Sequence, residues 1–145
     1  MESWRKVWRE GIAPQLSRSG LEALRNALIS DDDRLLQGST SRPPPLQCMH
    51  DCAVEGACAV GYCGWQGDEL ETVGALDEFF AKVCYETDRH FGEPTACRWF
   101  LNWFDDTPRA EMRRRLLPEV NAVLAERHRA EQAESKPQAE AVVAA

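Results

Sequence analysis

The chain has 145 residues, of which 43% are hydrophobic and 28% are charged, a composition typical of one globular domain with a core of ordinary size. Its net charge of −7 is uneven, because residues 31–110 carry six basic and fifteen acidic side chains. An acidic middle argues against a nucleic-acid partner. No run approaches the roughly 18 consecutive apolar residues of a membrane span, and the N-terminus lacks the apolar segment of a secretory signal. We therefore expect a cytoplasmic protein with no membrane partner.

The first third of the chain predicts two short helices. Large apolar residues recur at three- and four-residue spacing in both, namely Trp4, Val7, Trp8, Leu21, Leu24 and Leu28. Gly11 and Pro14 are expected to end the first helix, because proline cannot continue the hydrogen-bond ladder. Ser19, followed three residues later by Glu22, has the form of a capping box for the second helix. Residues 38–47 contain three successive prolines and are expected to form a stiff connector.

The strongest helical signal lies between residues 72 and 92. Its apolar stripe has the spacing of one helix face: Leu76, Phe79, Phe80, Val83, Cys84, Thr87 and Phe91. Gly92 is a natural residue to end this helix. The next helix, residues 94–104, is apolar nearly all round, which places it at the centre of a core. We expect Cys84 and Cys97, both on apolar helix faces, to be core residues.

A last helix is predicted over residues 108–128, where Pro118 should kink it or divide it in two. Residues 130–145 are poor in large apolar side chains and rich in Ala and Glu, so a flexible or disordered tail is expected. The fold class that follows is all-α. We predict a compact single-domain bundle of about six helices around the central aromatic helix 94–104. Residues 1–129 would form the domain, with the Pro-rich connector inside it.

Residues 48–64 hold four of the six cysteines and one of the three histidines. The candidate ligands for zinc or an iron–sulfur cluster are Cys48, His50, Cys52, Cys58 and Cys63. Their spacings match neither the two-residue zinc knuckle nor a ferredoxin pattern. In a single helix, Cys48 and Cys63 would lie about 22 Å apart along the axis. Only a loop bent at its glycines could therefore gather these side chains.

Packing is the alternative interpretation of this segment, and the one that we prefer. On a helical wheel small residues share one side, namely Ala53, Ala57, Val60, Gly61 and Gly64. Such a stripe lets a neighbouring backbone approach closely, and the helix 94–104 is the expected neighbour. Free cysteine behaves as a small buried hydrophobe. The segment lacks C-x-x-C, the spacing associated with redox thiols. A helical conformation here would favour packing, and a loop would favour a metal site.

These observations favour a non-catalytic protein-interaction or regulatory module of the bacterial-type soluble helical class. Its predicted partner is another protein, bound through an apolar or acidic surface that uses Trp4, Trp8 and Trp65, because Trp is enriched in binding hot spots. The alternative is a metal-binding protein with zinc or an iron–sulfur cluster, and otherwise no cofactor is expected. A third hypothesis is a small thiol-dependent enzyme. No sequence signature links a cysteine to His50, His90 or His128 as its base.

Overall fold

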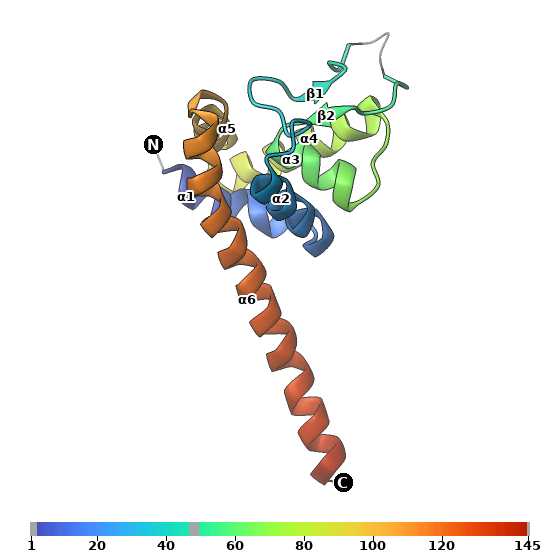
Figure 1. Ribbon diagram of the computed structural model, residues 1–145. Coiled ribbons are helices and arrows are strands. Elements are labelled where there is room, and N and C mark those ends of the chain that lie inside the picture. The colour runs from blue at the N-terminus through green and yellow to red at the C-terminus, as the bar shows by residue number, and fades with distance from the viewer. Residues whose placement is uncertain (1–2, 47–49, 145) are drawn as a thin grey trace.

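The computed structural model describes residues 3–46 and 50–144, with side chains as far as residue 135. Within these residues the chain forms six α-helices and one two-stranded antiparallel sheet (Figure 1). The helices are α1 (Trp4–Lys6), α2 (Arg18–Ser30), α3 (Ala59–Tyr62), α4 (Val73–Phe91), α5 (Ala96–Asp106) and α6 (Arg109–Ala144). The strands are β1 (Ser41–Arg42) and β2 (Gly56–Ala57). The predicted all-α bundle is confirmed.

The first helical segment is longer than the sequence predicts. After α1 the chain continues through a π-helical stretch, η1 (Val7–Ile12), and a 3₁₀ turn, η2 (Ala13–Gln15). Gly11 does not end the helix but lets it approach α4, because a Cβ on Gly11 would lie 2.7 Å from Thr87 Cγ2. Pro14 is accommodated in the first residues of the 3₁₀ turn, where its missing N–H has no helical acceptor to lose. The predicted end at Gly11 is therefore wrong.

The cap of α2 also differs from the expectation. Ser17, not Ser19, is the N-cap, and its Oγ accepts a hydrogen bond from the Gly20 amide at 2.9 Å. The same hydroxyl donates to Asp68 Oδ1 at 2.6 Å, which ties the start of α2 to a distant loop. Glu22 pairs with Arg18 at 3.0 Å instead of closing a capping box. The tertiary contact with Asp68 thus selects one of two serines that are equivalent by local sequence.

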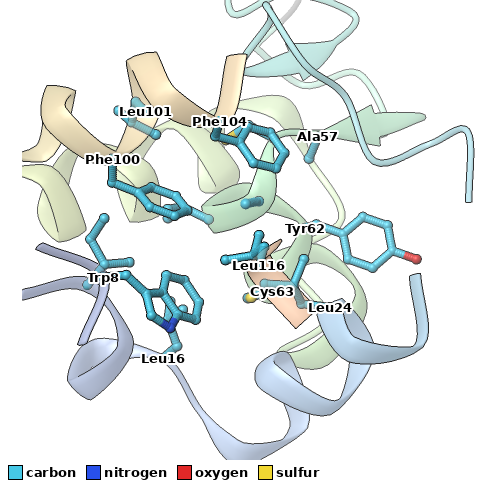
Figure 2. Packing of buried hydrophobic residues seen from close by; sticks show 14 of the residues in the cluster. Trp8, Leu16, Leu24, Ala57, Tyr62, Cys63, Phe100, Leu101, Phe104 and Leu116 are labelled. Atoms are coloured by element: carbon cyan, nitrogen blue, oxygen red, sulfur yellow. The ribbon is translucent and has the colours of Figure 1, made fainter. Parts of the chain in front are cut away.

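α4 follows its prediction, whereas α5 runs over Ala96–Asp106 and so begins after Pro94 instead of including it. The Thr72 side chain caps α4 by accepting from the Ala75 amide, and Gly92 ends it in the left-handed conformation at φ 67°. α5 buries a face that includes Phe100 and Phe104. Figure 2 shows these two rings with Trp8 of η1 and Leu116 of α6, so three different elements meet in one core. Apolar burial of this kind is the main favourable contribution to folding.

α6 runs without division from Arg109 to Ala144, past Pro118, and extends well beyond the body of the protein (Figure 1). Its first half buries an apolar stripe consisting of Met112, Leu116, Val120 and Val123. From residue 128 to 135 every side chain is exposed. The division into a domain over 1–129 and a flexible tail over 130–145 stays a prediction. Among the described residues no helix is both long and apolar enough to cross a membrane.

Candidate functional site

The cysteine-rich segment divides into two conformations. Residues 50–55 run as a loop along the start of α4, where the Gly74 amide donates to the His50 carbonyl at 2.8 Å and the Val73 amide to the Cys52 carbonyl at 2.9 Å. After β2 the chain becomes helical through α3 and the π-helical turn η4 (Cys63–Gly67). The segment is therefore neither one helix nor one loop.

The predicted ligands face different neighbours. His50 is exposed and its ring lies against Gly74, where an added Cβ would meet His50 Nε2. Cys63 is fully buried against α2, since a Cβ on Gly20 would lie 2.9 Å from the Cys63 Cβ. In the part of the chain that the structure describes, no three His, Cys, Asp or Glu side chains form a group that could hold a metal ion. Cys48 lies outside the described residues, so the metal site stays a prediction.

Burial controls the chemistry of two of these thiols. It raises the pKa of Cys58 to about 11 and raises the pKa of Cys63 further. Both thiols are therefore protonated at neutral pH, which makes them poor nucleophiles and poor ligands until they lose the proton. Their environment resembles that of apolar core residues.

The small residues of this segment do allow close packing, but against a different neighbour from the one expected. A Cβ on Gly64 would lie 2.8 Å from Phe79 Cδ1, and a Cβ on Gly61 would lie 3.3 Å from Leu76 Cδ2. Phe79 and Leu76 belong to α4, not to the aromatic helix α5. The error arises because a stripe of small residues indicates close approach without indicating which helix approaches.

Two of the three tryptophans predicted to contact a partner are core residues. Trp4 is 8% exposed and Trp8 is fully buried. Trp4 stacks on Trp103 with ring centroids 3.5 Å apart, and Trp8 lies 5.3 Å from the Phe100 ring. Figure 2 shows Trp8 directed into the interior. These indoles pack the first helical segment against α5, so most of their surface is buried inside the fold.

Trp65 is half-buried and belongs to a polar cluster. The Arg34 guanidinium lies over its ring at 5.3 Å, and the Tyr62 ring meets it edge-on at 5.8 Å. Tyr62 donates to Asp32 Oδ2 at 2.8 Å, and Asp32 also accepts from Arg34. Of the three predicted tryptophans, Trp65 has the most surface available to a partner. The interaction site on Trp4, Trp8 and Trp65 stays a prediction.

The clearest exposed aromatic side chain is one that the sequence reasoning missed. Tyr85, on α4, is 65% exposed and stands beside an open cavity of about 510 Å³ at the turn between α4 and α5. We name this cavity the Tyr85 groove, and its lining residues are Tyr85, Asp88, Arg89, Gly92, Glu93 and Pro94. A signal was present in the sequence, because Tyr85 falls outside the apolar stripe of its helix. An aromatic residue on the polar side has no place in the core.

A second cavity is smaller and more polar. It encloses about 160 Å³ between the loop at residues 38–40 and α5, and its lining includes Cys58, Arg98 and Asp105. Burial raises the pKa of Asp105, although its Oδ1 accepts from the Gly38 amide at 2.9 Å. Pockets for small organic ligands span about 300–1,000 Å³. This cavity lies below that range, so the Tyr85 groove is the better candidate site.

No protein-family model, curated protein or solved structure gives a significant match to this chain.

Proposed function

We propose that this protein is a cytoplasmic, non-catalytic interaction module that binds a segment of another protein in the Tyr85 groove. The observation that supports the proposal is the 65% exposure of Tyr85 beside an open groove. Tyrosine is enriched in interface hot spots, because it offers a large contact area and a hydroxyl with few rotatable bonds. Neighbouring turns of α4 continue the surface, since Ala81 and Arg89 are exposed on the same side as Tyr85.

The charges of the groove define the expected partner. Asp88 and Glu93 are the two acidic residues of the lining, and Arg89 is its one basic side chain. The sequence segment 31–110, which includes the lining residues, carries an excess of nine negative charges. Electrostatic complementarity governs the rate and specificity of association. We therefore expect a partner segment in which an apolar side chain that packs on Tyr85 lies next to a Lys or Arg.

Selection from a displayed random-peptide library, in the presence of a reductant, tests this function. We expect enriched peptides to pair an apolar residue with a basic one. Tyr85→Ala should weaken their binding about thirtyfold, the loss of a 2 kcal/mol hot spot. Ile29→Ala is the matched control, because Ile29 is an apolar side chain 58% exposed outside the groove lining.

Three outcomes would contradict the proposal. The selection could enrich no peptide, or the enriched peptides could bind Tyr85→Ala as tightly as the parent protein. Alternatively, Ile29→Ala could remove binding while Tyr85→Ala retained it, which would move the site to another face. Far-ultraviolet circular dichroism of both variants would show that α4 and the rest of the fold are intact.

A further inference from the structure

The thiols of Cys84 and Cys97 meet where α4 packs on α5. The Cys84 thiol donates a hydrogen bond to the Cys97 sulfur. One turn along α4 from Cys84, Asp88 Oδ1 accepts from the Cys97 backbone amide at 2.8 Å, which fixes the start of α5 against this face. The two sulfur atoms are therefore held together by the packing of two helices and by a main-chain hydrogen bond.

The two thiols differ in their surroundings. Cys97 is the second residue of α5, where the first three amides, those of Ala96, Cys97 and Arg98, are already bonded to Glu93, Asp88 and Thr95. The hydrogen bond from Cys84 lowers the pKa of Cys97, Arg98 adds to this effect, and burial and Asp88 oppose it. The same contact raises the pKa of Cys84. The lowered pKa makes Cys97 the better nucleophile of the two, and Cys84 is the neighbouring thiol that would react with it afterwards.

We propose that Cys84 and Cys97 are a peroxide-sensitive dithiol that closes into a disulfide joining α4 to α5. In the first step the Cys97 thiolate attacks one oxygen of hydrogen peroxide. The O–O bond breaks, a sulfenic acid forms on Cys97, and the departing hydroxide takes up a proton to give water. The Cys84 thiol then loses its proton and its sulfur attacks the Cys97 sulfur, which releases a second water. Two thiols are oxidised by two electrons, and one peroxide is reduced to two waters.

Access to the pair suits a small oxidant. Cys97 is 6% exposed and Cys84 is half-buried. A bulky disulfide reagent would therefore reach these thiols slowly, whereas the small hydrogen peroxide molecule would reach them readily. Asp88, which holds the Cys97 amide, also lines the Tyr85 groove, so the pair lies next to an open surface. Cys58 and Cys63 are buried, with raised pKa values, and should react more slowly. The proposal holds whether or not the groove binds a partner.

Peptide mapping gives a direct test, because the sequence places a tryptic site between the two cysteines. The protein is treated with hydrogen peroxide, its remaining thiols are alkylated in denaturant, and it is digested with trypsin. Cleavage after Lys82, Arg89 and Arg98 separates peptide 83–89, which holds Cys84, from peptide 90–98, which holds Cys97. We expect these two peptides to stay joined, and to separate after reduction. Four of the six thiols should remain open to alkylation.

Variants distinguish this dithiol from unspecific oxidation. Cys97→Ser should slow peroxide-driven thiol loss at least about tenfold, because it removes the thiol of lowered pKa. Cys84→Ser should stop the reaction at a sulfenic acid on Cys97 that dimedone captures, because the replacing hydroxyl still donates a hydrogen bond. Cys52→Ser, a half-buried control, should leave the joined peptides unchanged. The proposal is overturned if the joined peptides are absent, if other cysteines pair instead, or if Cys97→Ser oxidises as fast as the parent protein.

Discussion

Asp32 accepts hydrogen bonds from two neighbours, Arg34 and Tyr62. Arg34 donates to its two carboxylate oxygens, and the Tyr62 hydroxyl donates at 2.8 Å. The contact with Arg34 holds the pKa of Asp32 well below its usual range. Burial, followed by the hydrogen bond to Asp32, raises the pKa of Tyr62 to about 12. The Tyr62 proton is therefore retained by the folded protein at a pH where an unfolded chain releases it.

This pair gives a prediction for alkaline pH. The unfolded tyrosine ionises near pH 10, whereas Tyr62 keeps its proton to about pH 12, so its contribution to stability is complete below pH 10 and is lost between these values. Tyr62→Phe should cost about 1 kcal/mol at pH 8, the value of one hydrogen bond. Between pH 10 and 12 the free energy of unfolding should fall by up to about 2 kcal/mol more in the parent protein than in the variant. Urea unfolding across this range measures both curves, and parallel curves would contradict the assignment.

Among the elements, η4 and α2 make a close backbone contact. A Cβ on Gly67 would lie 2.3 Å from both the Cα and the amide nitrogen of Gly20. These are backbone atoms, so no side-chain rotation can relieve the overlap, and α2 itself would have to move. The contact holds the end of η4 directly against the start of α2.

Gly67→Ala should therefore destabilise the protein by about 3 kcal/mol or more, at the upper end of the cost of overpacking. Gly38→Ala is the matched control, since Gly38 has a φ of +83° but open space around it, and should cost only about 1 kcal/mol. Denaturant midpoints of the two variants give the comparison. Equal losses would mean that α2 shifts freely to accommodate the methyl group.

Local sequence predicts helices here better than it predicts their neighbours. The stripe of α4 and the end at Gly92 are both encoded within a few residues, by three- and four-residue spacing and by the left-handed conformation of the glycine. The contact of Cys84 with Cys97 depends on how α4 crosses α5, which no spacing within either helix reveals. Tyr85 could have been found, since its place on the polar side of α4 is a local property. The choice of Ser17 as the N-cap could not have been predicted from local sequence, because its partner Asp68 lies far along the chain.

In the whole molecule, α6 packs against the N-terminal segment of the chain. Glu119 pairs with Arg9 at 2.7 Å and with Arg5 at 3.2 Å, and Arg127 donates to the Ala13 carbonyl at 2.8 Å. Farther along the helix, Glu131 pairs with Arg18 at 2.6 Å. Exposed ion pairs contribute at most about 1 kcal/mol each. The buried stripe of α6, and not its far half, should therefore carry its stability.

Truncation tests this division of the helix. Removing residues 132–145 should change the thermal midpoint by no more than about 2 °C, because residues 132–135 are exposed and surface changes are worth at most about 0.5 kcal/mol. Removing residues 120–145 takes away the buried Val120 and Val123 and should cost at least about 3 kcal/mol. Thermal melts monitored by circular dichroism measure both. A large effect of the shorter deletion would show that the far half of α6 is bound to the body.

The position of residues 4–15 has a consequence for synthesis on the ribosome. Their partners lie in α4, α5 and α6. Trp8 therefore cannot pack on Phe100 until Phe100 has left the ribosome, and the Ala13 carbonyl cannot accept its hydrogen bond until Arg127 has emerged. At about 5–20 residues per second, this delay lasts roughly 5–25 seconds. During that time the apolar stripe of Trp4, Val7 and Trp8 is exposed to the solvent and to any chaperone at the exit tunnel. We therefore expect folding to finish after most of the chain has emerged, with the earliest helical segment among the last to dock.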